Sequence, residues 1–349
     1  MDIKNRHKSS MYQHHIYFYI KHIDIHKLNG KTLLVTGSTG LIGTFFIDVL
    51  MYSNVDVRLI ILCRDVSAAK AHFAFFRQRK NLLYIEIDIC KKIELPMPVD
   101  YIIHLASPAD PLNFAKHPIQ TIETNILSTK ELLDISVCNK AKIIFSSSGE
   151  IYGDCKISKI QENDFGYIDC LDVRSCYNES KRLAETLCKA YAIEKNIEFV
   201  ILRIPRCFGP TMRSNDSRSI SSFLRNAVMD EDVWLKSSGE QYYSYVYVGD
   251  CVTSIFYAMF YLNSNEAYNL GNDEKIKLLD MAKMISNLNP KIQLKHLVFD
   301  EFKDKGYSKV LNSILDTSKI TFYGWRPFFS VQEGLEISYK ILKDIKNVK

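Results

Sequence analysis

The sequence lacks long apolar runs and metal-ligand spacings, and these absences narrow the classes of protein it can belong to. No run approaches the ~18 apolar residues of a membrane-spanning helix. The apolar patch IYFYI at residues 16–20 is too short for a secretory signal or a membrane span. The nine cysteines form no CxxC pair and no Cys/His pattern suited to a metal. We therefore expect no metal, no membrane partner, and reduced thiols in a cytoplasmic protein.

A basic stripe with interleaved aromatic residues is also missing. The net charge of +5 is spread along 349 residues, so a nucleic-acid partner is not expected. The chain is 47% hydrophobic and 24% charged, which is an ordinary balance for a globular protein. Its length suggests two domains, or one large domain with a lobe.

Residues 1–29 form an amino-terminal extension without the pattern that follows it. Its histidines are interpreted as polar positions on a segment that packs against the main body, and not as metal ligands. They are His14, His15, His22 and His26.

From residue 31 onwards, short apolar runs alternate with amphipathic stretches. Continuous apolar strands separated by helices predict an α/β fold with a doubly wound parallel sheet covered on both faces. In such a sheet, ligands bind at the carboxyl ends of the strands. The predicted strands are residues 31–37, 57–63, 81–89, 99–107, 141–148 and 199–205.

The first predicted strand runs into TGSTGLIG, which supplies Gly37, Gly40 and Gly43. A glycine-rich turn between a strand and a helix lets the backbone approach a pyrophosphate, which then faces the helix amino terminus. This context predicts a dinucleotide site. At the end of the second strand, Asp65 could bind the adenosine ribose, or Arg64 could bind a 2′-phosphate, so both NAD and NADP remain open.

Polar residues end two further strands, at His104–Ser107 and at Ser146–Ser148, where this fold places its ligands. Tyr177 and Lys181 lie four residues apart in a predicted helix. A phenol titrates near 10, but a neighbouring ammonium and a positive nicotinamide ring would favour the phenolate. Ser148, Tyr177 and Lys181 can therefore converge to remove a proton from a sugar hydroxyl.

The motifs TGSTGLIG, HLASP, SSSGEIYG, YNESK and RIPRCFGP together resemble the extended short-chain dehydrogenase/reductase family that modifies nucleotide sugars. The resemblance covers roughly residues 30–345. It implies a Rossmann domain, residues 30–205 plus about 246–272, and a nucleotide-sugar lobe, about 206–245 plus 273–349. It also implies NAD, a nucleotide-diphosphate sugar substrate and a homodimer.

The resemblance assigns roles to individual residues. Ser148 orients the hydroxyl, Tyr177 is the base, Lys181 is its partner and Glu150 is a second acid/base group. The implied cofactor contacts are Gly37, Thr39, Gly40, Leu41, Ile42, Gly43, Arg64, Asp65, Asp88, Ile89, Leu105, Ala106, Ser107, Asn125, Tyr177, Lys181 and Pro205. The implied substrate contacts are Ser148, Arg206, Arg218 and Tyr243.

Within this family the likeness is greatest to UDP-glucuronate decarboxylases, through HLASPADPLNF, DVRSCYNESKRLAETLC, residues 215–218 (NDSR) and AYNLGN. The implied reaction oxidises the sugar at C4, loses carbon dioxide from the resulting β-keto acid, and reduces the ketone again. A 4,6-dehydratase, a 4-epimerase and a non-catalytic NAD(P)-binding sensor are the alternatives.

Four positions depart from the decarboxylase pattern. Ser148 and Gly149 replace the usual Thr-Ser, and Gly149 counts against dehydratases that place an aspartic acid there. Tyr243 stands where the family usually has an arginine that grips the diphosphate. Arg206 replaces a frequent asparagine and could supply the missing charge. Ser128 replaces a glycine, a minor change.

Overall fold

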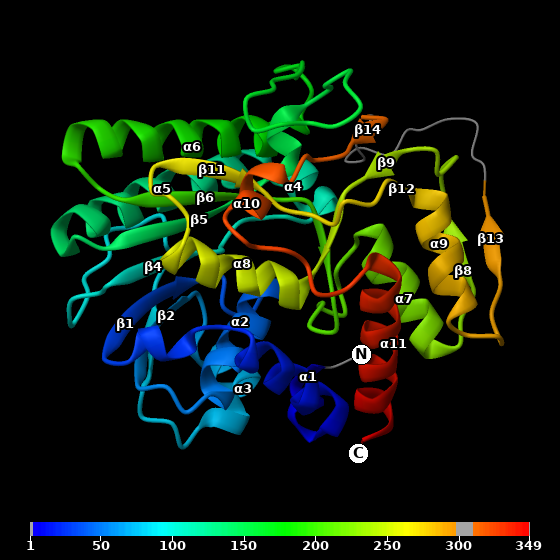
Figure 1. The fold of residues 1–349 in the computed structure, drawn as a ribbon, viewed down its shortest axis with the longest axis horizontal. Helices are drawn as coiled ribbons and strands as arrows, with labels where there is room; N and C mark the ends of the chain where they lie inside the picture. The colour runs from blue at the N-terminus through cyan, green and yellow to red at the C-terminus, as the bar shows by residue number, and fades with distance from the viewer. Residues whose placement is uncertain (1–2, 298–309, 349) are drawn as a thin grey trace.

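The computed structural model describes residues 3–297 and 310–348, and a seven-stranded parallel sheet lies at its centre (Figure 1). The strand order is β11-β6-β5-β4-β1-β2-β3, and every neighbouring pair is parallel. The strands are β1 (Lys31–Thr36), β2 (Val57–Cys63), β3 (Leu82–Glu86), β4 (Tyr101–His104), β5 (Lys142–Ser148), β6 (Phe199–Ile204) and β11 (Glu266–Asn269). The predicted doubly wound α/β fold is confirmed.

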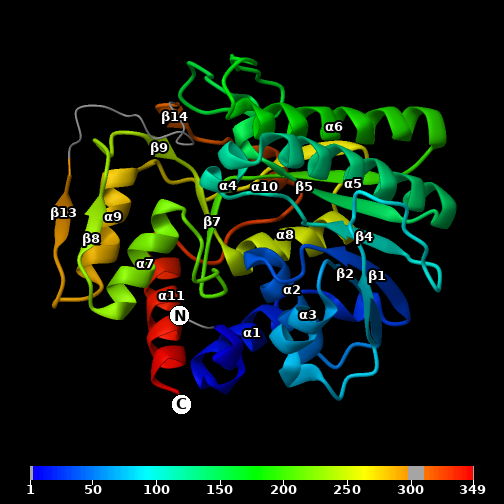
Figure 2. The ribbon, with the colours of Figure 1, turned by 180° about the vertical axis from the view of Figure 1, so that it is seen from behind.

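Helices cover both faces of this sheet, which is why its central strands are apolar throughout. All six residues of β6 are buried, and so are five of the six in β1. Helices α4, α5 and α6 lie on the face seen in Figure 2, while α2 and α8 lie on the opposite face. The helices around the sheet are α2 (Leu41–Tyr52), α3 (Val66–His72), α4 (Pro111–Lys116), α5 (Pro118–Asn139), α6 (Ser175–Lys195) and α8 (Val248–Phe260), with the short 3₁₀ helices η3 (Ala74–Phe76) and η4 (Gly149–Tyr152).

The sequence prediction missed the seventh strand. β11 has only four residues, of which the last two are buried, and it pairs with β6 at the edge of the sheet. Such a short run carries no periodicity that separates a strand from a loop.

Short strands and helices form the smaller part of the molecule, beside the carboxyl edge of the sheet (Figure 1). They pair as β10-β7, β12-β9-β14 and β13-β8. The elements are β7 (Arg206–Phe208), α7 (Ser219–Met229), β8 (Val233–Leu235), β9 (Tyr242–Tyr243), β10 (Tyr245–Tyr247), β12 (Ile276–Lys277), α9 (Leu278–Asn287), β13 (Leu294–His296), β14 (Asn312–Ser313), α10 (Ser318–Phe322) and α11 (Val331–Asn347).

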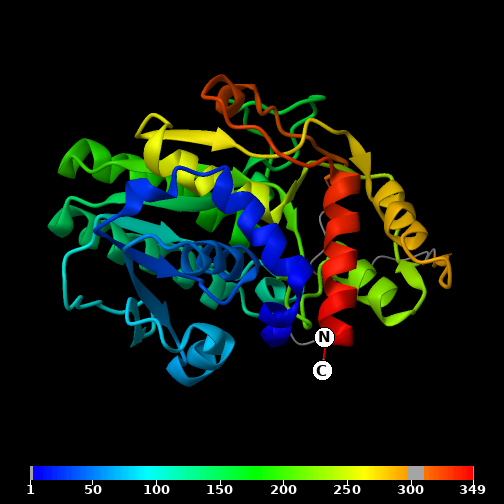
Figure 3. The ribbon, with the colours of Figure 1, turned by 60° about the horizontal axis from the view of Figure 1, so that its bottom comes forward.

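The amino-terminal extension packs against the main body, as predicted. Its helices are η1 (Ile3–Lys8), α1 (Ser10–Lys21) and η2 (Ile25–Leu28), and α1 lies against α2 and α11 (Figure 3). The guanidinium of Arg6 is fully buried and donates to both carboxylate oxygens of Asp48 on α2, at 2.5 and 2.9 Å. The hydroxyl of Tyr19 donates to Asp250 on α8 at 2.9 Å.

The interpretation of His15 as a polar position was wrong. Its ring is buried against Tyr19, Phe45 and Tyr247, and burial lowers its pKa to about 4. A helix in the extension needs one apolar face to pack, and His15 falls on that face.

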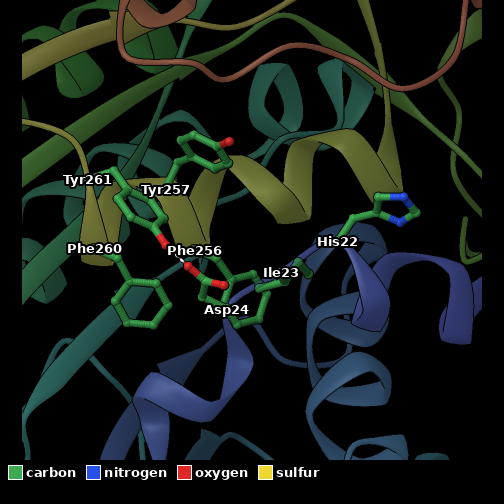
Figure 4. A pocket seen from close by; sticks show the side chains of 7 residues that line it. All are labelled: His22, Ile23, Asp24, Phe256, Tyr257, Phe260 and Tyr261. Carbon is green, nitrogen blue, oxygen red and sulfur yellow. Dashed lines mark hydrogen bonds between the residues drawn. The ribbon is translucent and has the colours of Figure 1, made fainter.

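The extension also forms a small cavity against α8, shown in Figure 4. Asp24 accepts a hydrogen bond from the hydroxyl of Tyr261, and the ammonium of Lys27 lies 4.0 Å from the centre of the same ring. None of the site residues predicted from the sequence lines this cavity.

Candidate active site

The turn between β1 and α2 brings backbone atoms closer together than side chains would permit. Gly37 has a φ of +68°, and a Cβ added there would lie 2.6 Å from the carbonyl carbon of Leu105. A Cβ at Gly43 would lie 2.3 Å from the oxygen of Gly37. Gly40 begins α2 without a side-chain cap, so the first backbone N–H groups of the helix have no such acceptor. The glycine-rich turn and these N–H groups form a backbone cradle that fits a pyrophosphate.

A pocket runs from this turn along the carboxyl ends of the strands to the smaller part of the molecule. It brings together most of the residues predicted from the sequence. Those that line it are Gly37, Gly40, Leu41, Ile42, Gly43, Leu105, Ser107, Ser148, Glu150, Tyr177, Lys181, Pro205, Arg206, Arg218 and Tyr243. Those that do not are Thr39, Arg64, Asp65, Asp88, Ile89, Ala106 and Asn125.

Two of the acidic cofactor candidates take part in local turns. Asp65 follows the end of β2 and caps α3, accepting from the backbone N–H of Ala68 at 2.8 Å. Asp88 accepts from the backbone N–H of Cys90 at 3.1 Å. Arg64, which precedes Asp65 in the chain, is exposed. Their contacts with a cofactor remain predictions.

Other candidates outside the pocket support its walls. Asn125 is buried on α5, where it donates to Ser180 at 2.9 Å and accepts from Ser107 at 2.7 Å. The carbonyl and hydroxyl oxygens of Thr39 accept from Arg213 at 3.1 and 2.8 Å. These bonds join the glycine-rich turn to the smaller part of the molecule.

Helix α6 begins at Ser175, which confirms that Tyr177 and Lys181 lie one helical turn apart. The ring of Tyr177 stacks on Phe114 with centroids 5.0 Å apart. Burial raises the pKa of Tyr177, and a hydrogen bond with Ser148 opposes that shift. Arg218 and Arg174 also lower this pKa while Glu150 raises it, and burial of the phenolate outweighs the lowering contributions, so the net pKa is raised. The expected lowering of the Tyr177 pKa by Lys181 is not seen in the protein alone.

Lys181 is itself buried, and its Nζ donates to the carbonyl oxygen of Ser146 at 2.8 Å. Burial lowers its pKa to about 7, although the carboxylate of Glu185 opposes this shift. The ammonium therefore titrates near neutrality in the protein alone.

Glu150, on η4, lies between two guanidinium groups. Arg174 donates to its Oε2 at 3.0 Å, and Nη2 of Arg206 lies 3.8 Å from its Oε1. Burial raises the pKa of Glu150, but Arg174 and Arg206 outweigh it, so the net pKa lies below the usual value. Glu150 is therefore a carboxylate at neutral pH.

The sequence analysis missed Arg174. It lies three residues before Tyr177, just ahead of α6, with its guanidinium carbon 5.5 Å from the centre of the Phe114 ring. A useful signal was available, because a basic residue one turn before a helical tyrosine lies on the same side of the helix.

In the wall of the pocket, the side chain of Arg206 lies over the ring of Tyr243. The guanidinium carbon of Arg206 lies 3.6 Å from the centre of the Tyr243 ring. Arg218 also lines the pocket, and its guanidinium pairs with Asp216 at distances of 2.5 to 3.1 Å. Four basic side chains line the described pocket, and Glu150 is its one carboxylate.

Within residues 3–297 and 310–348, no group of histidine, cysteine, aspartate and glutamate side chains is arranged to hold a metal ion. Over the same residues, no helix has the length and apolar character needed to cross a membrane.

Residues 33–271 match the NAD dependent epimerase/dehydratase family, which is more than half of the chain. The chain belongs to this family. It is thus a member of a family of NAD-dependent enzymes, and the resemblance found in its motifs is confirmed.

Curated relatives include UDP-glucuronic acid decarboxylase 1 of Xenopus tropicalis, which is 32% identical over 258 residues. That match covers 74% of this chain but only 60% of the frog protein. UDP-glucuronic acid decarboxylase 3 of Arabidopsis thaliana is 31% identical, with 87% of each chain covered.

Among solved structures, the UDP-glucose 4-epimerase of Thermotoga maritima superposes with a TM-score of 0.79 at 24% identity. The match covers 90% of this chain and 100% of the epimerase chain. A likeness at this level of identity supports the fold alone.

Proposed function

We propose that this protein is an NAD-dependent nucleotide-sugar enzyme that acts through a 4-keto intermediate, with UDP-glucuronate decarboxylation as its reaction. The observation that carries the proposal is the convergence of Ser148, Tyr177 and Lys181 beside an ionised Glu150 held by arginines. The decarboxylase relatives support the choice of substrate.

The glycine-rich cradle fits NAD, with Gly37, Gly40 and Gly43 at the pyrophosphate. Ser107 and Pro205 would line the rest of the cofactor site. When bound, NAD accepts a hydride from the sugar and later returns it.

Tyr177 removes the proton of the 4-hydroxyl group, and Ser148 holds that hydroxyl in place. Lys181, as an ammonium, favours the phenolate form of Tyr177. Once C4 is a ketone, the sugar carboxylate lies β to it and leaves as carbon dioxide, because the ketone delocalises the electron pair. The carbon that lost the carboxylate then takes up a proton, and reduction of the ketone with return of the Tyr177 proton gives the pentose. Glu150 is the second acid/base group, and it enters the reaction as a base because its arginines keep it ionised.

A 4,6-dehydratase or a 4-epimerase is the second proposal within the enzyme class. Gly149 counts against the dehydratase type that has an aspartic acid at this position, because glycine supplies no acid. A simple epimerase requires no second acid/base group such as Glu150.

A non-catalytic NAD(P)-binding sensor is the proposal from another class. Tyr243 favours it, because a phenol cannot replace a bidentate guanidinium. The assembled Ser148, Tyr177 and Lys181 oppose it. Absorbance in the reduced-nicotinamide band separates the two classes, since a sensor would show no change with any sugar nucleotide.

The decisive experiment is proton NMR of the protein with NAD and a panel of sugar nucleotides led by UDP-glucuronate. Formation of UDP-xylose with release of carbon dioxide is expected. A 4-keto-6-deoxy product or an inverted C4 from another sugar would move the function to a dehydratase or an epimerase.

We also propose a cytoplasmic homodimer. All nine cysteines lie in the described residues and are free thiols, which is typical of a reducing compartment. Large apolar side chains that are more than 40% exposed occur on α5 and α6, at Ile119, Ile122, Leu127, Leu183 and Ile193. The resemblance to the family implies a dimer, and an interface over α5 and α6 would bury these side chains.

A further inference from the structure

Arg206 presents hydrogen-bond donors that the described protein does not satisfy. Its Nε is buried without a hydrogen-bond partner among the described residues. Its Nη2 lies 3.8 Å from Glu150, which is beyond hydrogen-bond distance. Leaving a buried charged donor unpaired is costly, so this guanidinium is suited to an acceptor that arrives with a ligand.

The other two pocket arginines are already engaged. Arg174 donates to Glu150 at 3.0 Å, and Arg218 donates to both oxygens of Asp216. Glu150 therefore already has a hydrogen-bonded cationic partner in Arg174, and Arg206 keeps an Nε–H that no described residue accepts.

The ring of Tyr243 holds Arg206 in this position. Tyr243 is 6% exposed, and its strand β9 pairs with Ile276 on one side and Ser313 on the other. A guanidinium stacked on a fixed ring keeps its N–H edges free for hydrogen bonds in its own plane. Tyr243 thus holds the guanidinium of Arg206 in place, while the Nε–H of Arg206 has no partner among the described residues.

The position of the Arg206 guanidinium indicates which part of a bound ligand it would contact. Glu150, its neighbour, follows Ser148 by two residues, and Ser148 bonds Tyr177. The Arg206 guanidinium therefore lies at the end of the pocket that contains Ser148 and Tyr177. The glycine-rich turn at Gly37 belongs to the cofactor end.

We propose that Arg206, stacked on Tyr243, forms a subsite for the carboxylate of the reacting sugar and selects a nucleotide uronic acid over the 6-hydroxymethyl sugar. This inference rests on the proposed function, because it takes the sugar ring to sit beside Tyr177. A planar fork matches a carboxylate with two parallel hydrogen bonds, whereas a hydroxymethyl group offers no charge. Specificity then comes from a charge that only the uronic acid neutralises.

Calorimetric binding tests the subsite without turnover. The NAD-loaded Tyr177→Phe protein is titrated with UDP-glucuronate, UDP-glucose and UDP, alone and combined with Arg206→Gln. Arg206→Gln should weaken UDP-glucuronate at least about 10-fold, since a charged hydrogen bond is lost. UDP-glucose and UDP should change less than about threefold. The exposed Arg77→Gln is the matched control and should change none of them.

Equal weakening of all three ligands would place Arg206 at the diphosphate and would overturn the proposed carboxylate subsite. Unchanged binding of all three ligands would also overturn it. The variants Tyr243→Phe and Tyr243→Leu test whether the Tyr243 ring positions Arg206. They keep the proposal testable if Arg206→Gln does not fold. Phe keeps the ring and should retain the preference for UDP-glucuronate, whereas Leu should reduce it. Equal preference in both variants would contradict the role of the stack.

These results are separable from the proposed function. Selective binding that is lost in Arg206→Gln, without formation of UDP-xylose, would keep the subsite and remove the decarboxylase. Formation of UDP-xylose by Arg206→Gln at an unchanged kcat/KM would support the decarboxylase and overturn the subsite.

Discussion

At the residue scale, the pocket buries two ionisable groups whose pKa values shift in opposite directions. Tyr177 is buried, with its pKa raised, and Lys181 has its pKa lowered to about 7. Both shifts come mainly from burial, which disfavours the charged form of each group. In the proposed mechanism, a bound nicotinamide would add positive charge near Tyr177 and so favour its phenolate form.

Tyr177→Phe should bind NAD normally and lose turnover by about 10²–10⁴-fold, the usual contribution of a general base. Single-turnover kinetics and NAD titration measure the two effects. Thr186→Ala serves as a control on the same helix, because Thr186 is exposed and does not line the pocket. Turnover retained in the phenylalanine variant would exclude Tyr177 as the base.

Arg174→Gln should move the acidic limb of the kcat/KM profile to higher pH. The pKa of Glu150 is lowered because Arg174 and Arg206 outweigh burial, and removing one of them lets that pKa rise. The carboxylate then becomes protonated at a pH where it was ionised before. Arg174→Lys, which keeps the charge, should shift the limb less. An unmoved limb in the glutamine variant would show that Glu150 does not titrate in the reaction.

At the scale of elements, the amino-terminal extension contributes to the core. Asp48 on α2 and Asp250 on α8 are both fully buried carboxylates, and Arg6 and Tyr19 of the extension supply hydrogen bonds to them. Since α2 carries the glycine-rich turn at its amino end, the extension also supports the cofactor cradle.

Arg6→Ala should lower the free energy of unfolding by about 3–5 kcal/mol, because it leaves Asp48 as an uncompensated buried charge. Urea unfolding measures this loss. The double variant Arg6→Met with Asp48→Leu should recover most of it, and the exposed Arg77→Ala should cost little. A small effect in the single variant would mean that water reaches Asp48.

At the scale of the whole molecule, the exposed apolar residues of α5 and α6 lie on helices that cover one face of the sheet (Figure 2). Light scattering should give twice the chain mass of 40.3 kDa. Ile119→Arg with Ile193→Arg should yield a monomer, because burying two guanidinium groups at an apolar interface is costly. Phe322→Arg, on α10 and 85% exposed, should leave the dimer intact. A monomeric wild type would rule out the proposed assembly.

The sequence by itself determined where six of the seven sheet strands lie along the chain, the glycine-rich turn and the helical pair Tyr177 and Lys181. These features follow from local patterns, namely apolar runs, glycines at a strand end and a four-residue spacing. The resemblance to the family also identified Arg206 and Tyr243 as unusual positions, because both depart from the residues that the family usually has there.

Only the tertiary structure decided which charges meet. Arg174 and Arg206 are 32 residues apart in the chain, yet both face Glu150. The stack of Arg206 on Tyr243, the burial of His15 and the pairing of Arg6 with Asp48 likewise join distant segments. No local pattern encodes such contacts, because they depend on how whole strands and helices pack. The lowered pKa of Glu150 has the same origin, since burial and partner charges exist only in the folded chain.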